Sequence, residues 1–287
     1  MPLVTTGELV RAARAAGHGV AAFNVITLEH AEAIAAGAEA AGLPALLQVS
    51  ENAVKFHGGR LGPLAAAMAA VARSSRAPLA LHLDHVEDGE LLRAAHPAGF
   101  GSVMFDASKL PYAENVKATA EAVRWGHERG IWVEAELGRV GGKDGEPPLD
   151  AHAPGVRTDP AEAAAYVADT GVDALAVAVG STHAMTERTA ALDQALIGRL
   201  REAVPVPLVL HGSSGVPDGE IRRAVAAGMV KINVGTALNT AFTGAVRGYL
   251  TDRPAAVDPR KYLAPARDAM ARTVAHFLGL VAAPATS

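Results

Sequence analysis

The sequence contains no cysteine among its 287 residues, and aromatic residues make up only 4% of it. The lack of cysteine excludes disulfide bonds, thiolate nucleophiles and cysteine-ligated metals. The shortage of aromatic rings means that a core has to be packed with small and branched aliphatic side chains. Hydrophobic residues make up 50% of the chain, which is enough for a core of considerable size.

The sequence also lacks an excess of positive charge and a long apolar run. Its formal net charge is −4, which argues against nucleic-acid or anionic-membrane partners, because both need a basic field. Apolar runs are interrupted well before the roughly 20 residues that cross a bilayer, and the amino-terminal segment lacks the apolar core of a signal peptide. We therefore expect a cytoplasmic protein, in which any phosphate site is a local arrangement.

What is present is an alternation of short apolar runs with alanine-rich stretches of helical period. Strands are predicted near residues 20–24, 45–50, 78–84, 101–106, 131–136, 173–180, 207–211 and 229–234. Helices are predicted near residues 28–41, 61–74, 88–96, 112–129, 160–169, 193–203, 217–227 and 236–250. Such alternation requires parallel strands with crossover helices, and eight units in roughly 230 residues favour a closed (β/α)8 TIM barrel over an open doubly wound sheet.

The remaining segments fit one domain over residues 1–287, because no composition shift or linker divides the chain. An amphipathic helix is predicted before the first strand, and a C-terminal helical extension beyond residue 250. Residues 51–60 and 137–158 have no predicted element. Loops of that length in a compact domain are usually functional or mobile.

Polar side chains and glycines follow the predicted strands, although the strands themselves are apolar. In a (β/α)8 barrel the carboxyl ends of the strands meet around one mouth, which holds the active site. The pattern therefore predicts a site built from these strand ends: Asn24, Ser50, Asp84, His85, Asp106, Glu136, residues 180–183, His211, Gly212 and Asn233.

Three histidines among these residues indicate a metal site. His85, His183 and His211 follow strands three, six and seven, and three imidazoles with an open position are typical of catalytic zinc. A single histidine is more often structural, but three at matching strand ends beside carboxylates favour ligation. Asp84 next to His85 can bind the metal, orient a ligand or move protons. Strand alternation turns Asp84 and His85 to different sides unless the strand ends there. We therefore do not expect Asp84 both to bind the metal beside His85 and to move protons.

Two further patterns concern the surroundings of this site. His82 precedes Asp84 by two residues, so it shares that residue's face and is expected to support the site from below. The turn from Gly212 to Gly215 enters a helix and offers backbone N–H groups with a serine hydroxyl, which suits a phosphate. Barrels often bind phosphate after strands seven and eight, and residues 233–236 supply a second such turn.

Together, these motifs resemble the class II fructose-bisphosphate aldolase family. LHLDH at 81–85, VEAELGRVGG at 133–142, VGSTH at 179–183, LVLHGSSGVPD at 208–218 and KINVGT at 231–236 occur in order, and DPRKYL lies near the carboxyl end. The resemblance covers nearly the whole chain. It is nearest to the shorter branch that includes tagatose-bisphosphate aldolase.

The resemblance implies reversible, zinc-dependent cleavage of a ketose 1,6-bisphosphate, of the fructose or tagatose type, to dihydroxyacetone phosphate and an aldehyde phosphate. It implies zinc on His85, His183 and His211, proton transfer by Asp84, and a second or displaced metal position at Glu136 and Asp106. A monovalent cation, Na⁺ or K⁺, would bind the backbone of residues 182–184 and Gly212. The family is usually dimeric or tetrameric, so a homo-oligomer is expected. The implied substrate contacts are Asn24, Ser50, Gly212, Ser214, Asn233, Thr236, Arg260 at the far phosphate, and Asp144 in the long loop.

Four departures from the family pattern leave the sugar open. Ala184 and Ser213 stand where glycine is common, Gly235 stands where fructose enzymes carry aspartate, and Asp144 replaces a glutamate. A related aldolase of different sugar specificity and an impaired aldolase-like subunit therefore stay as alternatives.

Two other enzyme classes also stay as alternatives. A Schiff-base aldolase would use Lys231, which precedes Asn233 by two residues and is otherwise expected to be a charge-paired lysine of the barrel. A metal-dependent hydrolase barrel usually carries a His-x-His pair on its first strand, and here that strand reads Ala22-Phe23-Asn24.

Overall fold

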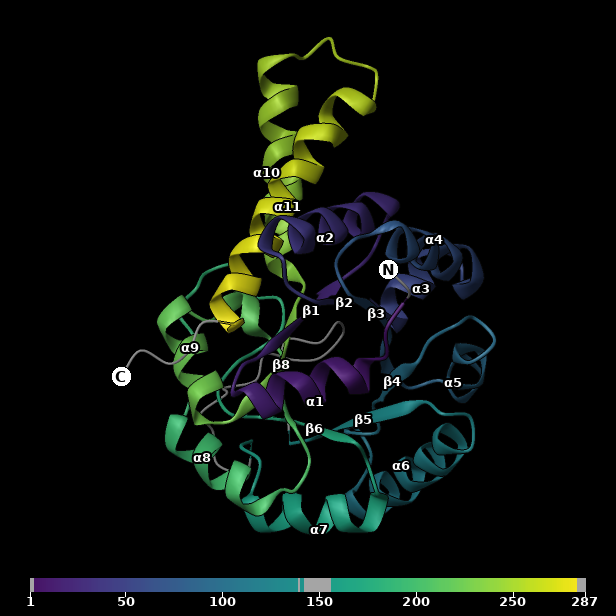
Figure 1. Cartoon of the computed structure of the whole chain (residues 1–287), viewed down its shortest axis with the longest axis vertical. Coiled ribbons are helices and arrows are strands. Elements are labelled where there is room, and N and C mark those ends of the chain that lie inside the picture. The colour runs from purple at the N-terminus through teal and green to yellow at the C-terminus, as the bar shows by residue number, and fades with distance from the viewer. Residues whose placement is uncertain (1–2, 139, 142–155, 283–287) are drawn as a thin grey trace.

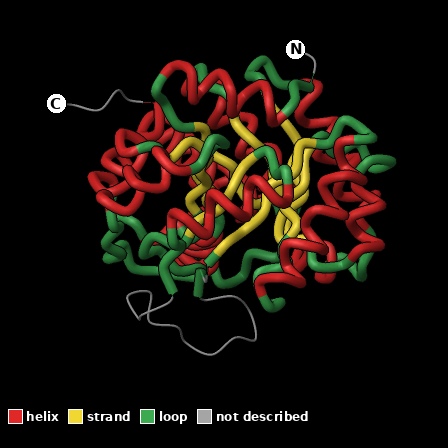
Figure 2. The backbone as a smooth tube through the Cα atoms, turned by 90° about the horizontal axis from the view of Figure 1, so that it is seen from below, coloured by secondary structure: helices red, strands yellow, loops and turns green. Residues whose placement is uncertain are grey.

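Eight parallel strands close into a barrel in the order of the sequence. The computed structural model describes residues 3–138, 140–141 and 156–282. Figure 2 shows the strands inside a layer of helices, so the predicted (β/α)8 barrel is confirmed. The strands are β1 (Val20–Asn24), β2 (Ala45–Ser50), β3 (Leu79–Val86), β4 (Ser102–Phe105), β5 (Trp132–Leu137), β6 (Ala174–Val177), β7 (Leu208–Leu210) and β8 (Met229–Val234).

The crossover helices lie outside the barrel and close to their predicted positions. They are α2 (Leu28–Ala41), α4 (Leu61–Ser74), α5 (Gly89–Ala95), α6 (Tyr112–His127), α7 (Pro160–Thr170), α8 (Gln194–Ala203), α9 (Asp218–Ala227) and α10 (Thr236–Asp252). Their starts follow local chemistry: Asp159, for example, caps α7 with a side-chain oxygen that accepts from the backbone N–H groups of Ala161 and Glu162.

Residues 51–60 were expected to have no regular element, and that expectation is wrong for the first six. They form the short helix α3 (Glu51–Phe56), which Ser50 caps by accepting from the N–H of Ala53 at 3.2 Å. A serine cap with an acidic first residue is a regular helix start. The consequence is that α3 lies over the carboxyl ends of the strands, where the site was predicted.

The strand β6 is shorter than predicted, because it ends at Val177 and not near residue 180. Gly180 has a φ of 125°, a backbone conformation that residues other than glycine rarely adopt. Beyond β6 the chain therefore leaves the barrel wall. This path brings His183 over the mouth.

The barrel interior is layered from an apolar floor to a polar mouth. The helix α1 (Thr6–Ala16) covers the amino-terminal end, where its Leu9 and Val10 pack in one cluster with inward residues of four strands: Val20, Ala22, Leu46, Ala80 and Val230. Because side chains that point inward recur every second residue, the next layer up holds the buried polar groups Gln48, His82 and Glu134. Buried Lys231 belongs to the same layer, although it directly follows Val230, because the pairing of β7 with β8 shifts register at this point. The layer above them is the mouth.

The carboxyl-terminal segment forms the predicted helical extension. The helices α10 and α11 (Arg260–Ala282) run side by side and project from the barrel, as Figure 1 shows. The later part of α11 returns to pack against α2 and β1. Within the described part of the chain, no helix combines the length and the apolar character needed to cross a bilayer.

Candidate active site

A cavity of about 550 Å³ opens at the carboxyl ends of the strands. Its lining includes most of the residues predicted for the site: Asn24, Ser50, Asp84, His85, Asp106, His183, Gly212, Ser214, Asn233 and Thr236. His211 and Glu136 lie buried at the same strand ends, with exposed fractions of 0% and 1%. Residues far apart in the sequence thus meet at one mouth.

Four side chains in this region form a group that could hold a metal ion. His85, Glu136, His183 and His211 each offer one ligand atom, and these atoms lie within 4.8 Å of one another. The imidazole centroids are separated by 4.8 Å for His85 and His211, 5.1 Å for His85 and His183, and 5.7 Å for His183 and His211. Three imidazole nitrogens with one carboxylate are a donor set that suits a zinc-like divalent ion.

The backbone at His85 explains how two consecutive residues reach the same cavity. His85 has a φ of 50°, and the pairing of β3 with β4 shifts between Leu83 and Val86. Strict strand alternation would turn Asp84 and His85 to opposite sides. The irregularity removes that constraint, and both residues line the cavity.

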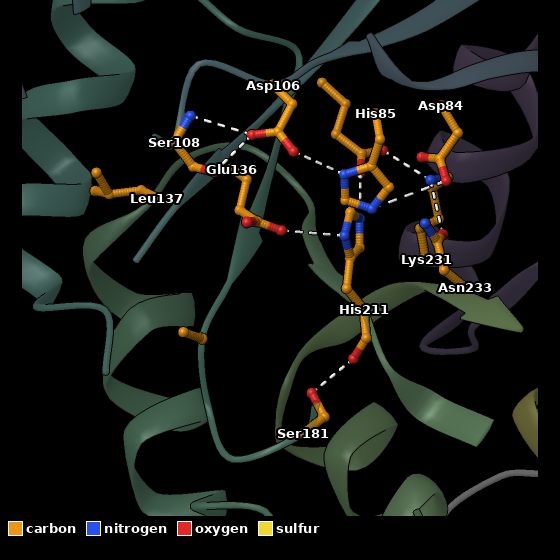
Figure 3. A network of polar contacts seen from close by, with 12 residues as sticks. Asp84, His85, Asp106, Ser108, Glu136, Leu137, Ser181, His211, Lys231 and Asn233 are labelled. Carbon is orange, nitrogen blue, oxygen red and sulfur yellow. Dashed lines mark hydrogen bonds and ion pairs between the residues drawn. The ribbon is translucent and has the colours of Figure 1, made fainter. Parts of the chain in front are cut away.

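Asp106 lies next to His85 but outside the group of four. Its Oδ2 accepts a hydrogen bond from Nδ1 of His85 at 2.8 Å, and its Oδ1 accepts from the hydroxyl of Ser108 at 2.6 Å (Figure 3). A carboxylate on one ring nitrogen fixes the tautomer and leaves the other nitrogen for a metal. The geometry therefore suits an orienting role for Asp106.

His211 is held between two buried glutamates. Its Nε2 donates to Oε1 of Glu134 at 3.0 Å, and its Nδ1 lies 3.2 Å from Oε2 of Glu136. Burial lowers the pKa of His211, but the hydrogen bonds to Glu134 and Glu136 outweigh it and raise the pKa to about 9. Glu134 lies on the Nε2 side of the ring and Glu136 on the Nδ1 side, and a carboxylate beside Nδ1 also attracts a cation bound to that nitrogen.

Asp84 is 2% exposed, with a hydrogen bond to one carboxylate oxygen and a histidine near the other. Its Oδ2 accepts from the amide of Gln48 at 3.3 Å, and its Oδ1 lies 3.7 Å from Nε2 of His82, which is beneath it as the strand pattern predicts. Burial raises the pKa of Asp84, but the charge of His85 and the hydrogen bond from His82 hold it well below its usual range. An ionised carboxylate in the cavity can accept a proton.

Three buried polar residues lie beneath the mouth: Gln48, Glu134 and Lys231. The sequence analysis missed the first two and left the role of Lys231 open. The ammonium of Lys231 lies 2.8 Å from Oε2 of Glu134 and 2.8 Å from Oδ1 of Asn233. Gln48 donates to Asn24 at 2.5 Å as well as to Asp84. Each of the three precedes a predicted site residue by two positions, so inward alternation was the signal that could have found them.

This buried layer argues against a Schiff-base aldolase. Lys231 is 0% exposed, and it is not among the described residues that line the cavity. The positive charge of Lys231 also stabilises the ionised form of Glu134. Burial raises the pKa of the Glu134 carboxyl, but Lys231 and the hydrogen bond from His211 lower it to about 2. A lysine engaged in this way has neither access to a carbonyl carbon nor a free amine.

The turns after β7 and β8 are tied together by serine hydroxyls. Residues Ser213–Gly215 form a short 3-10 turn, in which the Ser213 hydroxyl donates to the carbonyl of Asn233. The Ser214 hydroxyl accepts from the N–H of Ala237 at 3.1 Å, so its hydrogen is available to a ligand. The departure at Ser213 thus serves to hold the two turns, while Ser214 lines the cavity.

Ala184 adopts a left-handed backbone with a φ of 58°, where glycine would be unstrained. Two residues earlier, Thr182 lies against Gly212, which has a φ of 67° and where an added Cβ would come within 2.5 Å of the carbonyl oxygen of Thr182. The two segments are thus in close backbone contact. This is the place at which the resemblance implies a monovalent cation.

One predicted substrate contact is not brought to the cavity, and another lies outside the described residues. Arg260 begins α11 and pairs with Asp258 at 2.8 Å, and its side chain is 88% exposed. It is not among the described lining residues. Asp144 lies outside the described residues, so the structure does not place it.

Comparison with known proteins agrees with this geometry. The family described as class II fructose-bisphosphate aldolase matches residues 4–284. The structure of the YdjI aldolase from Escherichia coli K12 is similar with 31% identity and a TM-score of 0.83, over 97% of both chains. The fructose-bisphosphate aldolase of Campylobacter jejuni, 22% identical, shares the fold with a TM-score of 0.82 over 98% of this chain and 95% of its own. The chain described here belongs to the class II fructose-bisphosphate aldolase family.

Proposed function

We propose that the protein catalyses the zinc-dependent, reversible aldol cleavage of a ketose 1,6-bisphosphate, of the fructose or tagatose type, to dihydroxyacetone phosphate and an aldehyde phosphate. Family membership supports aldolase activity on a ketose phosphate. The observation that carries the finer proposal is the group of His85, Glu136, His183 and His211 within 4.8 Å, next to a buried carboxylate in the same cavity.

In this proposal His85, His183 and His211 hold the zinc ion, and Glu136 offers an additional oxygen. When bound, zinc supplies Lewis-acid stabilisation of the negative charge that develops beside the carbonyl as the carbon–carbon bond breaks. Asp106 and Glu134 would orient His85 and His211 through Nδ1 of His85 and Nε2 of His211, which leaves the other nitrogen of each ring for the ion. Imidazole ligands favour zinc over magnesium, and cobalt or manganese can substitute.

Asp84 removes the proton of the C4 hydroxyl during cleavage and returns it during condensation. Its support is geometric: the carboxylate lines the cavity, and Gln48 and His82 hold it from below. A buried side chain that accepts from Gln48 on one oxygen and lies near His82 with the other is already oriented when the substrate binds, which reduces the entropy that the reaction has to overcome.

The substrate is then oriented by the two ends of the cavity. Gly212, Ser214, Asn233 and Thr236 hold the phosphate of the dihydroxyacetone half, and Asn24 and Ser50 line the sugar. We also propose a monovalent cation near the backbone of residues 182–184 and a homodimer or homotetramer, both on the family resemblance.

The glycine at position 235 lets the amide of Asn24 approach, since an added Cβ would meet its Nδ2 at 3.0 Å.

The decisive experiment measures cleavage of D-fructose and D-tagatose 1,6-bisphosphates before and after metal removal. We expect turnover of at least one of them, loss of turnover with a chelator, and recovery with Zn²⁺. Full activity in metal-free protein, or an adduct trapped on lysine by borohydride, would contradict the proposal. Turnover of a different ketose phosphate alone would instead support the alternative of a related aldolase, which the departures at Ala184, Ser213, Gly235 and Asp144 leave open.

A further inference from the structure

The cavity has a second end, opposite the phosphate turns. In a closed barrel of eight strands β3 lies across from β7, so the loops after β3 and β4 face the turn that follows β7. This second end is lined by Lys55 of α3, Glu87 after β3 and Lys109 after β4, together with Glu51. We call these four residues the rim cluster. If dihydroxyacetone phosphate binds at the turns after β7 and β8, the aldehyde half extends toward the rim cluster.

Lys55 and Lys109 are the only lysines or arginines among the described residues that line the cavity. Arg260, for which the resemblance implied contact with the far phosphate, pairs with Asp258 at the start of α11 and is not among the described lining residues. The net charge of the chain is −4, so an anion at the far end needs local cations. The described part of this chain offers two.

Each of these lysines rests on a glutamate that can release it. Lys55 lies 2.7 Å from Oε1 of Glu51 with a side chain 66% exposed, and Lys109 lies 2.8 Å from Oε1 of Glu87 with a side chain 48% exposed. Ion pairs that are this exposed contribute little to stability. A long, flexible lysine can therefore exchange its carboxylate for a substrate anion at small cost.

Glu51 keeps partners when its lysine turns away. Its Oε2 accepts the backbone N–H groups of Glu87 at 2.8 Å and Asp88 at 3.0 Å. The pKa of Lys55 is raised first by the hydrogen bond to Glu51, and Glu87 and Lys109 also act on it, which agrees with one compact cluster. The glutamates thus position both ammonium groups at the rim before a substrate arrives.

We propose that Lys55 and Lys109 together bind an anionic group, a phosphate or a carboxylate, at the far end of the aldehyde half of the substrate. The inference rests on the proposed aldolase function and adds two specificity-determining residues to it. Each of the two ammonium groups can donate to an oxygen of the anion, and hydrogen bonds between charged groups are roughly twice as strong as neutral ones.

The test measures condensation of dihydroxyacetone phosphate with pairs of charged and uncharged aldehydes. The first pair is D-glyceraldehyde 3-phosphate and D-glyceraldehyde, and the second is succinic semialdehyde and butanal. The readout is the ratio of kcat/KM for the charged over the uncharged member. It is compared in the metal-loaded wild type, the Lys55→Met/Lys109→Met variant and the control Lys117→Met, which removes an exposed lysine of α6 that does not line the cavity.

We expect the wild-type ratio to exceed one for the phosphorylated pair and to fall about ten- to a hundredfold in the double variant, because two charged hydrogen bonds are lost. The control should keep the wild-type ratio. A fall for glyceraldehyde phosphate alone identifies phosphate as the anion, and a fall in both pairs identifies terminal negative charge in general.

A ratio that is unchanged in the double variant overturns the inference and leaves the proposed function standing. The same holds for a wild type that condenses charged and uncharged aldehydes equally well. A wild type that condenses none of the aldehydes and cleaves no ketose phosphate refutes the proposed function, and the inference with it.

Discussion

Inside the barrel, the ammonium of Lys231 lies 2.8 Å from Oε2 of Glu134, and both side chains are 0% exposed. Glu134 also holds His211 at 3.0 Å, and Lys231 also holds Asn233 at 2.8 Å. One buried ion pair therefore connects a proposed metal ligand with a proposed phosphate-binding residue. Buried pairs contribute little net stability, but removing one partner leaves an uncompensated charge.

The first prediction is that Glu134→Gln destabilises the protein by about 3–5 kcal/mol, because Lys231 stays buried without its anion. The double variant Glu134→Gln/Lys231→Met should recover part of that loss, since it removes both charges. The measurement is denaturant unfolding with circular dichroism. A single variant as stable as the wild type would show that the pair carries no such coupling.

The second prediction concerns the left-handed backbone at Ala184, whose φ is 58°. Ala184→Gly should stabilise the protein by about 1 kcal/mol, because glycine carries no Cβ penalty there. Ala190→Gly is the matched control: it lies in the same connection and is not among the described non-glycine residues with positive φ. The control substitution should destabilise the protein, because glycine gives the unfolded chain more conformational entropy to lose on folding.

The same substitution has a kinetic consequence. A less restricted backbone next to His183 should lower KM for the ketose phosphate or strengthen activation by K⁺ or Na⁺. A titration of both cations with the two variants measures this effect. Identical curves for Ala184→Gly and wild type would show that the residue's strain is unrelated to the phosphate end.

The third prediction separates ligands from orienting residues. His85→Ala should abolish tight metal binding, whereas Asp106→Asn should weaken it by about 10- to 100-fold, as for other groups that hold a metal ligand from behind. Competition with a chromophoric chelator measures both affinities without any activity assay. If Asp106→Asn loses the metal as completely as His85→Ala does, Asp106 is a ligand.

The fourth prediction assigns the proton transfer. Asp84→Asn should lower kcat by about 10²- to 10⁴-fold while the metal content stays at the wild-type level, because the amide cannot accept the C4 proton. Elemental analysis and kinetics on the same preparation provide the two measurements. Loss of the metal from this variant would place Asp84 in the ligand set and remove it from the proton step.

The fifth prediction tests the phosphate turn. Ser214→Ala should raise KM for the ketose phosphate more than it lowers kcat, since this hydrogen bond persists from ground state to transition state. Ser213→Ala, whose hydroxyl is engaged with the carbonyl of Asn233, should change KM less. Equal KM values for phosphorylated and unphosphorylated ketoses in the wild type would refute the site.

The sequence alone determined the architecture and most of the mouth. Eight apolar runs that alternate with helical stretches predicted the barrel, because each pattern reports a local period of the backbone. Closure then implied that polar residues at the strand ends meet, and the structure places Asn24, Ser50 and the three histidines at one mouth. These predictions needed only the position of a residue along its own strand.

The tertiary structure alone decided what depends on irregular backbone and on contacts between distant segments. The positive φ at His85 and Ala184 could not be read from the sequence. The sequence placed Asp84 and His85 at the same strand end, and only the irregular backbone shows how both side chains reach one cavity. Lys231 could be read from the sequence as a catalytic amine or as a paired lysine, and its contact with Glu134 decides for the second. Likewise, only the folded chain shows that α3 places Lys55 at the mouth and that Arg260 stays on the projecting helices. The positions of loops and helical extensions depend on the surfaces against which they pack, and a local sequence pattern does not contain those contacts.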